Sequence, residues 1–244
     1  MERKKTIIYI TTEKAKSVPN LYLFSLNLHR NFFFCIILLM DDIAEIKTYA
    51  RKEAVPIMQD ETQEFICNYI RELSQKQEQV RVLEIGTAIG YSAIQFARVA
   101  ENVSVVTIEI DIDRYLKAIQ NIKNCGLENR ITAYHADALT FEFPTAASLF
   151  DLIFIDAAKA QYINFFEKYK ANLAEGGAII SDNLSFHGMV EDLSLTHNYS
   201  TKKLVKKIRK YVLFLRENQE FQTEFFECGD GISVSKLASL NTFG

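Results

Sequence analysis

The chain has 244 residues, of which 48% are hydrophobic and 24% charged, with only 3 prolines. This composition supplies a hydrophobic core and excludes a disordered or collagen-like polymer. The 28 basic and 31 acidic residues give a net charge of −3, which excludes a globally basic nucleic-acid binder. Any nucleic acid must be held locally, and no DNA partner is expected. Four scattered cysteines without a C-x-x-C pair argue against a disulfide framework or a zinc site and favour the reducing cytoplasm.

Residues 1–39 differ in charge from the rest of the chain. They hold six basic and two acidic residues, which makes them +4 and the remainder −7. The apolar run 32–40 is much shorter than the about 20 residues of a membrane span, so no membrane association is expected. No small-x-small cleavage site precedes Asp41, which argues against a signal peptide. We expect 1–39 to be an atypical extension, and translation that begins at Met40 is one hypothesis that explains it.

The pattern becomes regular from Asp41 onward. Asp41 and Asp42 can cap a helix whose apolar positions recur at helical spacing up to Ala50, and Pro56 lies beyond its end. A second helix is expected at 61–73. Apolar runs then alternate with helix-period segments, which predicts strands at 80–85, 103–108, 131–134, 152–155 and 178–180 and helices at 91–100, 113–125 and 161–173.

This alternation is typical of repeated βαβ units and predicts a doubly wound, mostly parallel α/β sheet. The chain closes with a basic helix at 201–217 and two strands at 221–228 and 232–236. Gly229-Asp230-Gly231 between these strands predicts an antiparallel hairpin. Residues 40–244 are therefore expected to form a single domain with seven strands.

Gly86 and Gly90 lie in a turn between the first strand of this sheet and the following helix. Ligands bind at such turns at the carboxyl ends of parallel strands, and glycine lets the backbone approach them. The pattern E-x-G-x-x-x-G that starts at Glu84 differs from the G-x-G-x-x-G of dinucleotide sites, so a dehydrogenase is disfavoured. Glu109 follows at the end of the second strand, where a carboxylate accepts hydrogen bonds from ribose hydroxyls. Glu84 suits a cofactor with an ammonium group and no phosphate, such as S-adenosylmethionine, and the alternative is a tight turn without a ligand.

Asp156 and the pair Asp182-Asn183 end two neighbouring strands, so their side chains should meet at one edge of the sheet. Two carboxylates and an amide oxygen suit Mg²⁺, with waters or substrate oxygens as further ligands. An aspartate at a strand end is also commonly a cap or turn former, which is the alternative. Lys159 follows Asp156 by three residues and should point towards the same edge, unless it is only an exposed lysine that opens a helix.

The segment 201–216 has seven basic residues and no acidic one. Its apolar positions predict a buried stripe of Leu204, Val205, Ile208, Tyr211, Val212 and Leu215. The basic residues are then left on an exposed face: Lys202, Lys203, Lys206, Lys207, Arg209, Lys210 and Arg216. Such a face could bind RNA phosphates, and the alternative is a solvated helix surface.

These motifs resemble those of class I methyltransferases. Within that class they resemble the cation-dependent O-methyltransferases, which are related to catechol and caffeoyl-CoA methyltransferases. The resemblance rests on 56–58, 84–92, 154–159 and 182–183, extends over 43–236 and leaves out 1–39. It is greatest for bacterial tRNA 5-hydroxyuridine methyltransferases, whose pattern continues to 229–231. It implies a Rossmann-like fold and an enzyme, dependent on S-adenosylmethionine and Mg²⁺, that converts wobble 5-hydroxyuridine in tRNA to 5-methoxyuridine.

The reaction would be in-line methyl transfer from a sulfonium to a hydroxyl whose pKa the metal lowers. Catechols share the adjacent oxygens of 5-hydroxyuridine, so a small phenol is the alternative substrate. A nucleotide-fold binding module without turnover is the alternative outside the enzymes. Members of this family are often homodimers, which is left open for this chain.

The resemblance also implies roles for single residues. The cofactor would contact Met58, Glu84, Gly86, Ser92, Glu109, Asp137, Ala138 and Asp156. Asp137 would read the adenine amino group together with Ala138, and its alternative role is a loop cap. The metal would be held by Asp156, Asp182 and Asn183, with Lys159 as the general base of a catalytic pair with Asp156. The RNA would contact Lys202, Lys203, Lys206, Lys207, Arg209 and Lys210, while His187 would line the substrate entrance or be an exposed loop histidine.

Overall fold

The computed structural model describes residues 42–144, 148–185, 190 and 192–238, and the backbone of three short strands before them. The chain divides into two units, 1–45 and 46–244. In the first unit, β1 (Ile8–Tyr9), β3 (Phe34–Ile36) and β2 (Leu23–Ser25) pair antiparallel in that order. An extension at 1–39 followed by a domain at 40–244 stays a prediction.

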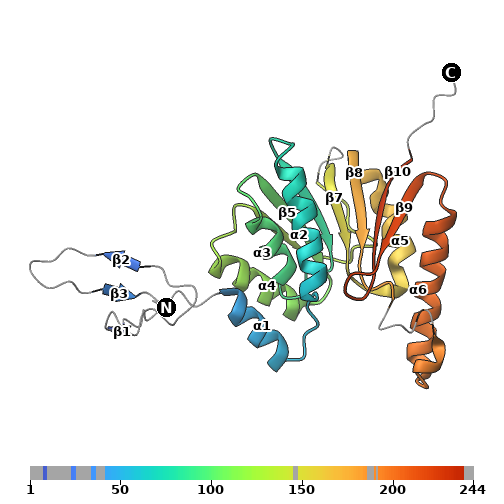
Figure 1. The fold of residues 1–244 in the computed structure, drawn as a ribbon, viewed down its shortest axis with the longest axis horizontal. Helices are drawn as coiled ribbons and strands as arrows, with labels where there is room; N and C mark the ends of the chain where they lie inside the picture. Colours follow the sequence, from blue (N-terminus) through green and yellow to red (C-terminus); the bar gives the residue numbers. More distant parts are fainter. Residues whose placement is uncertain are drawn as a thin grey trace, which may run out of the picture. The chain divides into compact units, whose positions relative to one another are not determined.

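The second unit is built on a seven-stranded sheet. Its strands are β4 (Val80–Ile85), β5 (Val103–Glu109), β6 (Ile131–His135), β7 (Phe150–Ile155), β8 (Leu173–Ser181), β9 (Phe221–Phe226) and β10 (Ile232–Leu237). Their order is β6-β5-β4-β7-β8-β10-β9, and all neighbours are parallel except β10, which is antiparallel to both β8 and β9 (Figure 1). The order reverses between β4 and β7, so these two strands form the switch point at which such sheets bind ligands. The predicted mostly parallel sheet with a C-terminal hairpin is confirmed.

Helices cover both faces of this sheet (Figure 1). They are α1 (Asp42–Lys52), α2 (Asp60–Ser74), α3 (Tyr91–Arg98), α4 (Ile112–Asn124), α5 (Tyr162–Tyr169) and α6 (Tyr199–Glu217). Successive side chains of a strand point to opposite faces. Ile153 and Ile155 of β7 therefore share a core with Phe166 of α5 and Tyr211 of α6. Phe154 between them packs edge-to-face on Phe96 of α3, at 5.6 Å between ring centroids.

The structure departs from the predicted elements most clearly around β8. This strand begins at Leu173, whereas the sequence predicts helix up to that residue and a strand only from 178. α5 ends at Tyr169, and a 3-10 turn, Lys170–Asn172, leads into the strand. Gly176, with φ of +74°, follows within the strand, and the register with β7 shifts. A strand is recognised in a sequence by the alternation of apolar and polar residues. Glycines and an irregular register interrupt that alternation in β8.

Two further expectations concern the whole chain. Within the described part of the chain, Cys67, Cys125 and Cys228 form no disulfide, while the side chain of Cys35 lies outside the described residues. Within the described part of the chain, no helix is both long and apolar enough to cross a bilayer.

Candidate active site

The turn after β4 is pressed against the end of β7. The backbone N–H of Asp156 donates to Ile85 O at 3.0 Å, and that of Gly86 donates to Ile108 O at 3.0 Å. A Cβ on Gly86 would lie 2.1 Å from the backbone oxygen of Asp156, and Gly86 has φ of +106°. Only glycine fits this position without a backbone shift. The predicted cofactor turn and the predicted metal ligand Asp156 are therefore adjacent at the switch point.

Glu84, near the end of β4, is a fully buried carboxylate with two hydroxyl donors. The Thr107 hydroxyl donates to Glu84 Oε2 at 2.6 Å from the adjacent strand β5. The Ser92 hydroxyl, in the first turn of α3, donates to Oε1. Burial raises the pKa of Glu84 to about 7, against the opposing effect of these two donors. A cationic group of a ligand beside Glu84 would favour the ionised form, as the sequence predicts for an ammonium group.

Glu109, at the end of β5, is oriented by two backbone donors. Ala88 N donates to its Oε2 at 2.7 Å, and Asp111 N donates to its Oε1 at 2.9 Å. Ala88 has φ of +46°, an uncommon conformation for alanine, within the glycine turn. Each carboxylate oxygen can accept more than one hydrogen bond. Glu109 is therefore held rigidly, and its oxygens can also accept hydrogen bonds from ribose hydroxyls.

Asp137 and Ala138 lie in the loop after β6. Asp137 Oδ1 accepts a hydrogen bond from Leu139 N at 2.8 Å, which is the loop-capping contact that the sequence leaves as an alternative. The Tyr169 hydroxyl donates to Ala138 O at 2.7 Å and ties this loop to the end of α5. The cap uses one oxygen of the Asp137 carboxylate, and adenine recognition by this residue stays a prediction.

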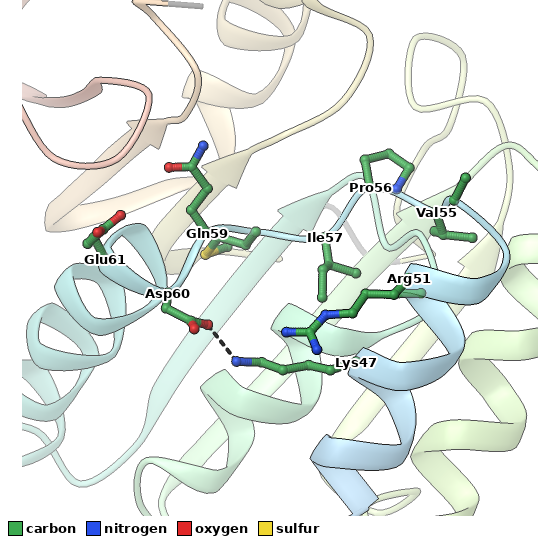
Figure 2. A pocket seen from close by; sticks show the side chains of 11 residues that line it. Lys47, Arg51, Val55, Pro56, Ile57, Gln59, Asp60 and Glu61 are labelled. Carbon is green, nitrogen blue, oxygen red and sulfur yellow. Dashed lines mark hydrogen bonds and ion pairs between the residues drawn. The ribbon is translucent and has the colours of Figure 1, made fainter. Parts of the chain in front are cut away.

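A pocket of about 690 Å³ is lined by α1, the segment 54–59 and the first turn of α2. In Figure 2, Lys47 and Arg51 extend from α1 towards α2, where Lys47 contacts the Asp60 carboxylate at 2.6 Å. Met58, a predicted cofactor contact, belongs to the pocket wall and is buried. Small-molecule sites have volumes of about 300 to 1,000 Å³. The pocket is large enough to hold part of a cofactor or substrate.

Asp156, Asp182 and Asn183 meet where β7 and β8 end. The side-chain amide of Asn183 donates to Asp182 Oδ2 at 3.0 Å and reaches Asp156 Oδ1 at 3.4 Å. Asn183 has φ of +63°, a left-handed conformation that asparagine tolerates better than most residues. The structure thus places the Asn183 amide within hydrogen-bonding distance of both predicted carboxylate ligands.

The charged groups at this edge influence one another. Burial, together with the negative charge of the neighbouring Asp156, raises the pKa of Asp182 to about 7. Burial also raises the pKa of Asp156, whereas the positive charge of Lys159 lowers it. Lys159 lies in the 3-10 turn η2 (Lys159–Gln161), and its positive charge lowers the pKa of Asp182 as well. A cation between the carboxylates would relieve their repulsion.

The donor set fits a hard divalent cation once the Asn183 amide turns. Half a turn about the last side-chain bond exchanges its nitrogen and oxygen and presents an oxygen to the two carboxylates. Carboxylate and amide oxygens are ligands that Mg²⁺ accepts. Among the described residues, no group of three His, Cys, Asp or Glu side chains could hold a metal ion, so a metal bound here would need the Asn183 amide as its third protein ligand.

α6 approaches this site from the carboxyl edge of the parallel strands. β9 begins at the opposite edge, because β10 is antiparallel to β8 and β9 is antiparallel to β10. α6 ends at Glu217, shortly before β9, so its first turns lie at the edge that carries the site. Val205, Ile208, Tyr211 and Leu215 are buried, and Leu204 and Val212 pack against the core, which confirms the predicted stripe.

The opposite side of α6 carries what we call the basic face, formed by Lys203, Lys206, Lys207 and Lys210, all exposed. Within the described part of the chain, none of the four forms an ion pair. Lys202 is half-buried. Arg209 donates from Nε to Val190 O at 2.6 Å, so this predicted RNA contact is also engaged within the fold.

Sequence reasoning missed two side chains that contact the site. Thr107 could have been found, because aligning the first residues of the first two predicted strands places it opposite Glu84, as observed. Thr62 donates to Asp182 Oδ1 at 3.5 Å across 120 residues of sequence, and no local pattern indicates that contact. His187, the predicted substrate-entrance residue, lies outside the described residues.

With this geometry in view, the chain was compared with known proteins. Residues 39–237 match the profile of a family described as O-methyltransferase. A catechol O-methyltransferase from Niastella koreensis is 31% identical over 154 residues, which cover 62% of this chain and 67% of that protein.

Two solved structures also superpose on this chain. A Staphylococcus aureus protein, provisionally assigned as a caffeoyl-CoA O-methyltransferase, superposes with a TM-score of 0.75 at 34% identity over 80% of this chain and 92% of its own. A Bacillus cereus O-methyltransferase in complex with SAH has a TM-score of 0.66 at 24% identity over 82% of this chain and 94% of its own, a likeness of fold alone.

Proposed function

The chain belongs to the O-methyltransferase family, and we propose that it transfers the methyl group of S-adenosylmethionine to a hydroxyl oxygen in a reaction that depends on a divalent cation. The observation that carries this proposal is the adjacency of the glycine turn to Asp156. A Cβ on Gly86 would clash with the Asp156 backbone oxygen, so a cofactor in the turn would lie directly beside the Asp156, Asp182 and Asn183 cluster.

The cofactor is bound by groups whose chemistry matches its parts. Glu84, with Ser92 beside it, receives the ammonium group, and Glu109 accepts hydrogen bonds from the ribose hydroxyls. Met58 contributes an apolar contact. These residues would hold the cofactor at the carboxyl edge of the sheet, where it would supply the sulfonium methyl group. Orientation of two reacting groups is itself a large part of catalysis for a methyl transfer.

Asp156, Asp182 and Asn183 would hold the Mg²⁺ ion, which lowers the pKa of a substrate hydroxyl and fixes its position when bound. Lys159, once its ammonium has given up a proton beside the positive charges of the cation and the sulfonium, would accept the hydroxyl proton at its neutral Nζ as the oxygen attacks the methyl group. Its position in η2, close enough for its charge to lower the pKa of both Asp156 and Asp182, supports this role. Such a site favours substrates with two adjacent oxygens.

The basic face of α6 supports RNA as the substrate. Its four exposed lysines form no ion pair among the described residues, and the chain around them has an overall charge of −3. Clustered lysines of this kind bind phosphates without a requirement for sequence. We therefore propose wobble 5-hydroxyuridine in tRNA, whose 5-hydroxyl neighbours the C4 carbonyl, as the acceptor, and the cytoplasm as the compartment.

A small phenol is the second candidate, and the names of similar proteins favour it. The Niastella koreensis relative is named a catechol O-methyltransferase, and its match includes 62% of this chain. A catechol offers the same pair of adjacent oxygens. The two candidates therefore differ in how the rest of the substrate is held, not in the chemistry.

The test is methyl transfer from labelled S-adenosylmethionine with Mg²⁺, to tRNA that contains 5-hydroxyuridine, to the same tRNA without it, and to catechol. We expect label in the first tRNA only, with 5-methoxyuridine detected by mass spectrometry of its nucleosides. Efficient transfer to catechol alone would contradict the RNA assignment and support the second candidate. No transfer to any acceptor would contradict the enzyme assignment.

A further inference from the structure

We propose that Thr62 is a positioning residue that holds Asp182 in the orientation required for metal binding, and that the turn 228–231 holds Thr62 in place. This inference rests on the proposed function, because it concerns the cation site of that function. Its basis is a set of contacts between three segments that are far apart in the sequence.

The two carboxylate oxygens of Asp182 have different surroundings. Oδ1 accepts from the backbone N–H of Asn183 at 2.7 Å and from the Thr62 hydroxyl at 3.5 Å. Oδ2 faces the Asn183 side-chain amide, which also reaches Asp156. Oδ1 is therefore the anchored oxygen, and Oδ2 is the one available to a cation.

The main chain of Asp182 is fixed as well. Its backbone N–H donates to Ile155 O at 3.3 Å, and its carbonyl accepts from the Tyr162 hydroxyl at 3.2 Å. With the main chain fixed, the remaining freedom is rotation of the carboxylate. The Thr62 hydroxyl opposes this rotation from the side of α2. Thr62 itself is 0% exposed, so its hydroxyl does not exchange readily with solvent.

Gly229 closes over Thr62 from the hairpin turn. A Cβ on Gly229 would lie 2.4 Å from Thr62 Oγ1 and 3.2 Å from Gln59 Oε1. Any larger residue would therefore push the hydroxyl away from Asp182. Gly229 has φ of +54°, a conformation in which glycine is favoured.

The same turn is joined to the segment that follows Asn183. Leu184 N donates to Gly231 O at 3.0 Å, and Ser185 N donates to Asp230 O at 2.6 Å. Asp230 is mostly buried and close enough to raise the pKa of Asp182. The hairpin turn thus lies against Thr62 and is hydrogen-bonded to the segment that follows Asn183. It therefore fixes the distance between Thr62 and Asp182.

Removal of a side chain that hydrogen-bonds to a metal ligand typically lowers metal affinity by about 10- to 100-fold. The contact of Thr62 is long, so we expect a loss near the lower limit of that range. The test is a titration of the metal-free full-length protein with Mn²⁺, in which electron paramagnetic resonance measures the free ion. This readout needs neither cofactor nor substrate.

Thr62→Val removes the hydroxyl and keeps the shape, and we expect it to weaken Mn²⁺ binding by about tenfold. Thr62→Ser keeps the hydroxyl and is the matched control, with binding within about twofold of wild type. A purely structural role for Thr62 would not separate the two variants in this way. Circular dichroism checks that both are folded.

Gly229→Ala tests the turn in a double-mutant cycle. Alone, it should weaken Mn²⁺ binding about as much as Thr62→Ala alone, because its Cβ displaces the Thr62 hydroxyl. Combined with Thr62→Ala, it should add little, because the displaced atom is already gone.

Equal Mn²⁺ affinity of wild type and Thr62→Val, or additive losses in the cycle, would overturn this proposal and leave the proposed function intact. Wild-type protein that binds no Mn²⁺ would instead contradict the cation requirement of the proposed function, and this inference with it.

Discussion

Glu84 and Thr107 face each other on the neighbouring strands β4 and β5, and the Thr107 hydroxyl donates to the Glu84 carboxylate at 2.6 Å. The Thr107 hydroxyl in turn lies 2.5 Å from that of Thr87, in the glycine turn. A carboxylate with a pKa of about 7 is therefore built into the rigid sheet and connected to the cofactor turn.

This arrangement predicts that cofactor binding depends on pH. The pKa of Glu84 is about 7 in the free protein, and a bound ammonium group stabilises the ionised form. Affinity for S-adenosylhomocysteine, measured by calorimetry without divalent cations, should rise about tenfold from pH 6 to pH 8. Glu84→Gln should bind more weakly at pH 8 and lose this pH dependence. A wild-type affinity that is constant over this range would contradict the assignment of Glu84.

Stability of the ligand-free protein should depend on pH in the opposite direction. The pKa of Glu84 is raised from 4.5 to about 7 on folding, and that of Asp182 from 3.8 to about 7. Between these values the folded state binds more protons than the unfolded state, so the free energy of unfolding falls as pH rises. Urea denaturation should show the fall between about pH 4.5 and pH 7. Glu84→Gln should make the curve flatter, and a variant as steep as wild type would argue against Glu84 as its source.

Removal of the metal or of one metal ligand should abolish methyl transfer. We expect Asp156→Ala and Asp182→Ala to reduce the rate by about 100-fold or more. Loss of an outer partner of a metal ligand costs up to about 100-fold, and loss of the ligand itself should cost at least as much. Circular dichroism should show a folded protein. A chelator should have the same effect on wild type, with recovery on addition of Mg²⁺. Full activity of Asp156→Ala in chelator would exclude the proposed metal site.

The basic face of α6 should determine how RNA binding responds to salt. Lys206→Gln with Lys207→Gln should weaken tRNA binding and reduce the slope of log affinity against log salt by about 2. The matched control is Lys76→Gln with Lys123→Gln, which removes two exposed charges elsewhere and should leave the slope unchanged. Methylation of catechol, if it occurs, should be equal in all variants. Equal slopes for the two double variants, measured by fluorescence anisotropy, would exclude the basic face as the RNA contact.

Gly86→Ala should be far more damaging than Gly126→Ala. Both glycines have positive φ, but the added Cβ at Gly86 meets the Asp156 backbone oxygen at 2.1 Å, whereas nothing lies within 4 Å at Gly126. We expect Gly126→Ala to cost about 1 kcal/mol for its backbone conformation alone. Gly86→Ala should cost about 3 kcal/mol or more, because the ends of β4 and β7 must separate. Chemical denaturation of both variants measures the difference, and equal costs would mean that the two strand ends are not tightly packed.

Much of this site could be predicted from the sequence, because its parts follow local rules. The alternation of apolar runs with helix-period segments predicts parallel strands, whose carboxyl ends share one edge. Asp156 and Asp182 were therefore expected to meet, and the amide of Asn183 does reach both. The glycine turn after Glu84 and the buried stripe of α6 were also expected from their spacing.

Tertiary structure alone decided which distant side chains support these groups. The contact of Thr62 with Asp182 depends on how α2 packs over the sheet, and the closure of Gly229 over Thr62 depends on where the hairpin places its turn. Local patterns encode period and turn chemistry, which concern residues close in sequence. Register and helix packing join residues far apart and depend on the shape of the whole core, so the orientation of the Asp182 carboxylate is a property of the fold.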